Sequence, residues 1–249
     1  KIFSMINLNL MKIKIFNELS LENEKKTGKI ELTSNKFKRI AKYQIEKNSF
    51  NFRIFDKINQ PKIFYRGNLN FKPFYASVEG NLDKINLNYL FASNAIIAQL
   101  LKTEIFNNKN IDFKINITAG NVQYNENVRN IILESKIQDG LIDVDKTKFS
   151  WKNFVDFELI ESLIYVRDGE LVLDGKLKIN VNDYNSLYKF LVTPKKYRNK
   201  IKQIDLNFTY NFDQKIAELK DIRVDNKINQ NINKILNSVI LKKEKFQNK

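Results

Sequence analysis

Carboxylates are the side chains of this sequence best suited to chemistry, and two pairs of them have a suitable spacing. Asp143 and Asp145 are separated by one residue, and so are Asp156 and Glu158. On a β-strand this spacing puts both members of a pair on one face. A pair of carboxylates that flanks a sugar bond is the machinery of a glycosidase. Solvated strand faces have the same pattern, and we favour that interpretation.

Two reactive residue types are missing from the 249 residues, which contain no His and no Cys. Without His, a Ser-His-Asp triad and imidazole metal ligands are excluded. Without Cys, thiol nucleophiles, thiolate-bound zinc, iron–sulfur clusters and disulfides are excluded. We therefore expect a protein that is not an enzyme and has no cofactor and no metal.

The chain is strongly basic, with 43 Lys and Arg against 28 Asp and Glu and a formal net charge of +15. Most of the Lys residues are dispersed between apolar residues, whereas a nucleic-acid footprint needs clustering. We expect no nucleic-acid partner, although a nucleic-acid binder remains an alternative. One local cluster follows Pro194, and its members are candidates for contact with anionic lipid headgroups: Lys195, Lys196, Arg198 and Lys200. A solvated loop is the other interpretation of this cluster.

The elements that must position these residues are mainly strands, because apolar and polar residues alternate along much of the chain. The clearest runs are Ile111–Ala119, Leu171–Val181 and Ile204–Phe212. A period of two predicts long antiparallel strands with one apolar face and one wetted face. Asp139-Gly140 and Asp168-Gly169 are typical hairpin turns. Gly175 interrupts its run and predicts a bulge or bend.

Helices are expected in three places. Residues 88–106 contain a helical insertion with an apolar stripe. Tyr184–Leu191 has the spacing of a short helix that Pro194 would stop. Residues 228–249 have a narrow apolar stripe followed by a polar end, which predicts an amphipathic helix and a frayed tail.

So little helix cannot cover the apolar face of the predicted sheet. The sheet is expected either to curl, so that its apolar face lines a groove, or to pack on a second sheet as a closed β-sandwich. The candidate groove-lining residues share the apolar parity of their runs, which is also the pattern of an ordinary core: Phe113, Ile115, Ile117, Leu171, Leu173, Leu177, Ile179, Leu206, Phe208 and Tyr210.

Phrases in which Asp-Gly is followed by alternating apolar residues occur in Lys136–Val144 and Asp168–Gly175. The helical Tyr184–Leu191, the basic Lys195–Arg198 and the alternating Ile204–Asp213 follow. Leu219–Lys227 closes the series. Over about residues 65–240, this succession resembles the C-terminal region of bacterial AsmA-like proteins, which are bridge-like lipid-transfer proteins of the AsmA/TamB type.

The resemblance implies a curled, taco-like β-sheet that binds phospholipid acyl chains in an apolar groove. It further implies lipid transport between the inner and outer membranes, a role in envelope integrity and envelope protein partners. The location would be periplasmic, with a tether to the inner membrane through a helix upstream of Lys1. We expect an N-terminal β segment at 1–64, an AsmA-like region at 65–227 and the terminal helix at 228–249. The alternative function is a structural or adhesive β-sandwich without lipid.

Overall fold

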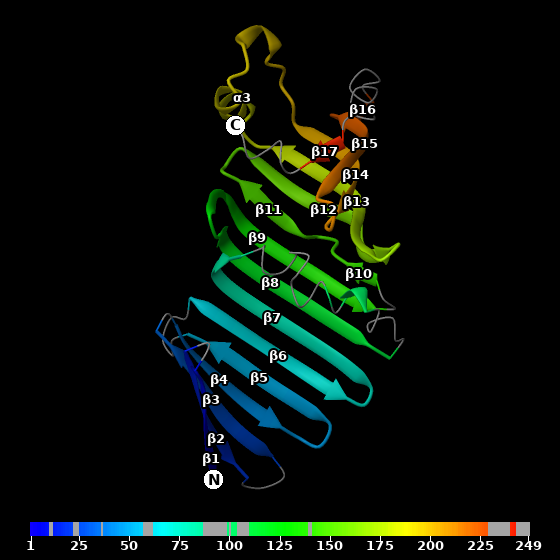
Figure 1. Ribbon diagram of the computed structural model, residues 1–249. Helices are drawn as coiled ribbons and strands as arrows, with labels where there is room; N and C mark the ends of the chain where they lie inside the picture. The colour runs from blue at the N-terminus through cyan, green and yellow to red at the C-terminus, as the bar shows by residue number, and fades with distance from the viewer. Residues whose placement is uncertain are drawn as a thin grey trace. The chain divides into compact units, whose positions relative to one another are not determined.

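The computed structural model describes residues 1–9, 12–21, 25–35, 37–56, 62–86, 99, 101–103, 110–138, 141–228 and 240–242. The chain divides into two compact units, and Figure 1 labels their helices and strands. Unit 1 consists of Lys1–Asp83 and Asn110–Thr118, and unit 2 of Lys84–Lys109 and Ala119–Lys249. The predicted boundary after residue 64 falls inside the strand Ile63–Phe71, which belongs to unit 1.

Unit 1 is an up-and-down series of antiparallel strands in which each strand pairs with the next along the chain. Short connections suit this topology because antiparallel neighbours need only a turn. The strands are β1 (Ile2–Leu8), β2 (Ile13–Ser20), β3 (Lys26–Ser34), β4 (Lys38–Ile45), β5 (Ser49–Phe55), β6 (Ile63–Phe71) and β7 (Phe74–Ile85). The first part of β8 (Asp112–Val122) also belongs to unit 1.

Unit 2 is antiparallel as well and contains the longest strands. The strands of unit 2 are β9 (Asn125–Gln138), β10 (Leu141–Asp143), β11 (Lys148–Trp151), β12 (Val155–Arg167), β13 (Glu170–Val181), β14 (Gln203–Asn211), β15 (Ile216–Val224), β16 (Lys227–Ile228) and β17 (Ile240–Lys242). The short β10 and β11 lie between β9 and β12. From β12 to β15 each strand pairs with the next, and β15 also pairs with β16 and β17.

The expected fold class is confirmed: the chain is mainly β, and its long strands pair in an antiparallel manner. The closed-sandwich alternative is not observed, because the described strands belong to one hydrogen-bonded sheet and not to two packed sheets. Asp168 and Gly169 have φ angles of 53° and 77°, which is the double positive φ that the predicted hairpin turn requires.

The helical predictions have mixed outcomes. Helix α3 (Tyr184–Phe190) matches the expected short helix, and the Asp183 side chain caps it by accepting from the Ser186 amide. In the predicted insertion at 88–106, residues 99, 101 and 102 are helical, and most of the rest lies outside the described residues. In the predicted helix at 228–249, Ile228 and Ile240–Lys242 are instead in strands that pair with β15. Backbone pairing with β15 therefore replaces helix at these positions, and the other residues of 229–249 lie outside the described part.

The ring of Tyr43 on β4 lies directly over Gly28 on β3, which shows how the sheet of unit 1 makes room for large aromatic side chains. Tyr43 lies across from Gly28 in the register, and a Cβ at Gly28 would be only 2.1 Å from the Tyr43 Cζ atom. Glycine is needed here because any side chain would displace the ring. The Tyr43 ring also lies 5.9 Å from the ring of Phe50 on β5.

Candidate functional site

The register of β13 and β14 brings seven of the predicted groove-lining residues to one face. Leu173 is opposite Tyr210, Leu177 is opposite Leu206, and Phe208 is opposite Gly175. Directly opposed residues of an antiparallel pair share a face, and so do residues two apart along one strand. We call this surface the apolar face of unit 2, and its β13 and β14 members are Leu171, Leu173, Leu177, Ile179, Leu206, Phe208 and Tyr210.

The neighbouring strands extend the apolar face on both sides. On β12, Phe157 is opposite Ile179, Leu159 is opposite Leu177, and Ile164 is opposite Leu173. On β15, Leu219 is opposite Phe208 and Ala217 is opposite Tyr210. Sequence analysis did not include these residues among the candidates, although the alternation of β12 before and after its bulge is the signal that would have identified them.

Burial varies across the apolar face. Leu171 is only 1% exposed and Leu206 is 8% exposed, so these two are core residues. Leu173, Leu177, Ile179, Phe208 and Tyr210 are half-buried. Desolvation raises the pKa of the Tyr210 phenol, which indicates a locally apolar environment. The face therefore combines a buried base near Leu171 with large apolar side chains that retain contact with solvent.

A bulge in β12 opposite Gly175 locks the register of this face. The pairing of β12 with β13 shifts between Ile160 and Leu163, and Glu161 has a φ of 48°. Ser162 is 1% exposed, and its hydroxyl donates to the Ile160 carbonyl at 2.9 Å. Its backbone N–H donates to the Asp145 carboxylate. The predicted irregularity therefore lies in β12, opposite Gly175, whereas β13 itself pairs with β14 without a shift at this position. Glycine is needed at 175 because the Ser162 side chain occupies the space of a Cβ.

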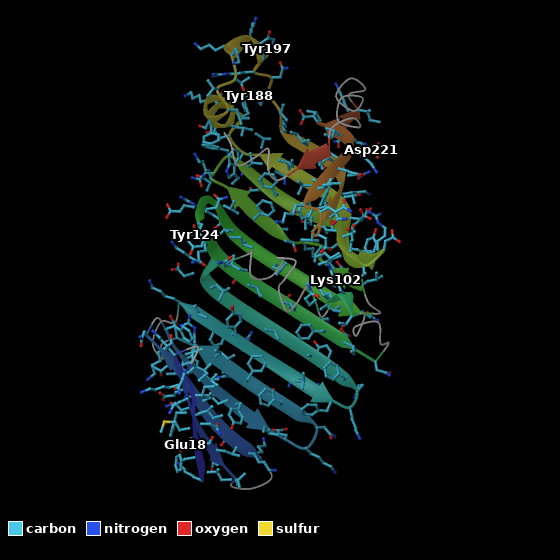
Figure 2. The ribbon with its side chains drawn as sticks, in the orientation of Figure 1. Glu18, Lys102, Tyr124, Tyr188, Tyr197 and Asp221 are labelled. Atoms are coloured by element: carbon cyan, nitrogen blue, oxygen red, sulfur yellow. The ribbon has the colours of Figure 1, made fainter. Side chains whose placement is uncertain are left out.

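An ion pair lies close to the buried end of the apolar face. Asp213, in the turn after β14, accepts from the Lys102 ammonium and from the Leu171 backbone N–H, the latter at 2.9 Å. Figure 2 shows Lys102 in unit 2. Burial acts to raise the pKa of Asp213, but the two hydrogen bonds and the Lys102 charge outweigh it and hold that pKa below its usual value. Leu101, beside Lys102, is a buried residue.

The remaining three candidates, Phe113, Ile115 and Ile117, lie on β8 in unit 1. All three are half-buried, whereas the intervening Lys114 and Asn116 are exposed. The predicted alternation on β8 is therefore present. The Ile117 side chain reaches within 3.4 Å of the position a Gly80 Cβ would occupy on β7.

The carboxylate pairs considered for glycosidase chemistry have structural partners. Asp145 binds the Ser162 backbone N–H, and Asp143 accepts from the Asp145 N–H at 2.8 Å. Glu158 forms an ion pair with Lys148 at 3.0 Å and is opposite Lys178 in the register. Asp145 thus holds the bulge of β12, and Glu158 joins β12 to β11.

The predicted basic cluster lies on an excursion between β13 and β14 that contains α3 and the 3-10 turn η3 (Lys195–Tyr197). Figure 2 shows Tyr188 and Tyr197 on this excursion, beyond the strands of unit 2. The Tyr188 hydroxyl donates to the Asn199 carbonyl at 2.8 Å, and Arg198 Nε donates to the Thr193 carbonyl at 2.8 Å. Lys195, Lys196 and Lys200 are exposed, and Arg198 is half-buried.

Aromatic packing anchors the excursion to the turn between β11 and β12. The Phe190 ring meets the Trp151 ring edge-on at a centroid distance of 4.9 Å. The Lys152 ammonium lies 4.0 Å from the centre of the Phe190 ring, a cation–π contact. Beyond this anchor, Leu191 is 55% exposed and Val192 is 84% exposed. Sequence analysis missed this anchor, because contacts between residues so far apart in the chain have no local pattern.

Unit 1 contains a hollow of about 980 Å³, and polar residues line most of it. Its charged lining residues are Lys1, Glu18, Lys29, Lys42, Arg53, Arg66 and Glu79. Apart from Lys1, these charged residues are directly opposite one another from β2 to β7 and therefore share one face of the sheet. Tyr43 and Phe52, which also line the hollow, occupy alternate positions of β4 and β5. Charged and polar residues are therefore the main lining of this hollow.

Neither a membrane-spanning helix nor a metal site is found in the described residues, and comparisons with known proteins give no match. Among these residues, no helix is long and apolar enough to cross a membrane. In the same part of the chain, no group of three or more Asp or Glu residues is arranged to hold a metal ion. No family model, curated protein or solved structure matches the chain. What the fold and site define is a class: an antiparallel β protein with an amphipathic sheet. The AsmA-like resemblance stays a prediction.

Proposed function

We propose that the apolar face of unit 2 binds the acyl chains of phospholipids, and that the protein supports lipid transport in the cell envelope. The observation that carries this proposal is the register of β12–β15, which gathers large apolar side chains on one face while several of them are only half-buried. A contiguous exposed apolar patch is uncommon on a soluble monomer and typically marks a binding surface.

The dimensions of the face suit an acyl chain. Leu171 and Ile179 are eight residues apart on β13, which at about 3.4 Å per residue corresponds to about 27 Å. One leaflet of a bilayer has an acyl layer of about 15 Å, half of the hydrocarbon core. Transfer of a methylene from water to an apolar surface contributes about 0.8 kcal/mol. An acyl chain therefore fits along the face, and its binding needs no catalytic group.

The excursion that contains α3 supports the same proposal. Between Tyr184 and Lys202 the chain has six basic residues and no acidic one. None of these basic residues forms an ion pair with another described residue. Exposed apolar side chains at Leu191 and Val192 next to such a cluster suit a bilayer interface, where apolar tips enter and cations meet anionic headgroups.

Native mass spectrometry of the full chain, with organic extraction of co-purifying material, tests the proposal. The variant Ile115→Asp/Leu177→Asp/Phe208→Asp places three charges on apolar positions of β8, β13 and β14. The matched control is Asn116→Asp/Asn180→Asp/Asn207→Asp, which adds the same charge to the polar parity of the same strands. We expect phospholipid with the wild type and the control, and none with the variant that carries Asp at 115, 177 and 208.

The alternative is a structural or adhesive domain that binds no lipid. A lipid-free wild type with a cooperative melt and no uptake of a fluorescent phospholipid would favour it and contradict our proposal. Equal lipid content in both triple variants would also contradict it. Circular dichroism of each variant shows whether the sheet has formed, and the milder Phe208→Ser repeats the comparison if the triple variant does not fold. Periplasmic location, an inner-membrane tether and envelope protein partners are further parts of this proposal.

A further inference from the structure

Four basic residues form a row across the hollow of unit 1. Lys29 on β3 is opposite Lys42 on β4, Lys42 is opposite Arg53 on β5, and Arg53 is opposite Arg66 on β6. Neighbouring strands are about 4.8 Å apart, so the row extends over about 14 Å. We call these four residues the cationic row. All four line the hollow, and Lys42, Arg53 and Arg66 are exposed.

Carboxylates accompany only the two ends of the cationic row. Lys29 forms an ion pair with Glu31 at 2.5 Å, and Arg66 forms one with Glu79. Within the described residues, Lys42 and Arg53 have no carboxylate partner. The Lys42 ammonium lies 6.0 Å from the centre of the Phe55 ring, a cation–π approach. The centre of the row therefore has two adjacent, uncompensated positive charges.

This arrangement is unfavourable for the sheet alone. Like charges directly opposite each other on neighbouring strands destabilise the pairing, and the row contains three such pairs in succession. A hollow also concentrates the field of one sign of charge. The hollow has five basic and two acidic lining residues. A bound anion would relieve the repulsion between the members of the row.

Neutral hydrogen-bonding side chains run parallel to the cationic row, two residues away from it on β4, β5 and β6. Gln44 is opposite Asn51, and Asn51 is opposite Asn68. All three line the hollow. The Asn68 amide donates to Asn51 Oδ1 at 2.6 Å, so the amides are ordered beside the cations. A ligand with several oxygen atoms would find both charges and hydrogen-bond groups here.

We propose that the hollow of unit 1 binds a ligand with at least two phosphate groups. The guanidinium of Arg53 presents a planar fork that suits phosphate oxygens, and Lys42 adds a point charge next to it. One phosphate group fits between these two side chains, and Lys29 or Arg66 meets a second. The ligand is either a soluble polyphosphate or the headgroup of a diphosphorylated lipid, since both carry this chemistry. The proposal does not rest on acyl-chain binding by unit 2.

Isothermal titration calorimetry of the full chain with tripolyphosphate and with inorganic phosphate tests the proposal. Lys42→Gln/Arg53→Gln removes the centre of the row. Lys47→Gln/Lys62→Gln is the charge-matched control, because both residues are exposed in unit 1 and neither lines the hollow. We expect the first variant to weaken tripolyphosphate binding by about tenfold or more, the effect of losing one or two charge-assisted hydrogen bonds. The control should bind like the wild type, and inorganic phosphate should bind more weakly.

A stability measurement separates lost binding from lost folding. Removal of Lys42 and Arg53 ends all three like-charge pairs, so the melting temperature without ligand should not fall. Vesicles that contain cardiolipin, compared with vesicles of neutral lipid, distinguish a lipid source from a soluble one. If the cationic-row variant loses the cardiolipin preference, the ligand is a headgroup; if only tripolyphosphate binding falls, it is soluble. No tripolyphosphate binding by the wild type at low salt, or equal binding by both variants, would overturn the proposal and leave the acyl-chain proposal unaffected.

Discussion

Replacement of Gly175 by Ala tests the register on which the apolar face of unit 2 depends. A Cβ at this position would be 2.0 Å from Ser162 Oγ, 2.6 Å from Ser162 Cβ and 2.9 Å from Ser162 Cα. Rotation of the Ser162 hydroxyl relieves only the first of these contacts. The other two involve the root of the side chain and the backbone, so β12 or β13 must move.

Overpacking of this kind costs about 1–3 kcal/mol, and contacts to backbone atoms favour the upper part of that range. We therefore expect Gly175→Ala to lower the free energy of unfolding of unit 2 by about 2–3 kcal/mol. Ser162→Gly removes the Cβ and Oγ contacts. The double variant should recover about 1–2 kcal/mol relative to additivity, as expected for side chains in direct contact.

Urea unfolding followed by the fluorescence of Trp151, the single Trp of the chain, measures unit 2 directly. Gly169→Ala is the control, because nothing lies within 4 Å of its added Cβ and only its φ of 77° opposes the change. It should cost about 1 kcal/mol and should gain nothing from Ser162→Gly. A Gly175→Ala variant as stable as the wild type, or a cost that Ser162→Gly leaves unchanged, would show that β12 and β13 have a different register.

Three further predictions concern unit 2. Asp213→Asn should lower the free energy of unfolding by about 1 kcal/mol near neutral pH. The pKa of folded Asp213 lies below its ordinary value of 3.8, so the advantage of the wild type should be complete above pH 3.8 and disappear on further acidification. Urea titrations at several pH values will measure this, and Lys102→Met should have the same effect. Asp183→Ala removes the cap of α3, so hydrogen exchange of the α3 amides should quicken, whereas Asp183→Asn should preserve protection; unchanged exchange in Asp183→Ala would contradict the capping role. Phe190→Ala should destabilise the excursion by about 1 kcal/mol and shift the emission of Trp151 to longer wavelength, and an unchanged spectrum would show that the two rings do not pack in solution.

Part of this structure follows from local sequence alone. Alternation predicts which residues share the apolar parity of β8, β13 and β14, because successive side chains of a strand point to opposite faces. The Asp168-Gly169 turn is predictable for a local reason too, since few other residue pairs accept two positive φ angles. The spacing of Tyr184–Phe190 likewise predicts α3. In each case the decisive interaction joins residues close together in the chain.

Tertiary structure decides which strands pair and in which register, because many strand residues pair with partners that are far away in the sequence. The bulge at Ser162 determines how β12 aligns with β13, and that alignment depends on the partner strand as well as on β12 itself. The apolar stripe of 228–249 predicts a helix, but Ile240–Lys242 pairs with β15, since an open strand edge offers unpaired backbone groups.

The cationic row is the clearest case of this limit. Lys29, Lys42, Arg53 and Arg66 are dispersed along the sequence, and each by itself has the character of a solvated residue. Only the register of β3–β6 places them side by side across the hollow of unit 1. The sequence alone determines the alternation that makes this sheet amphipathic. The pairing of its strands decides where the apolar side chains and the charges accumulate.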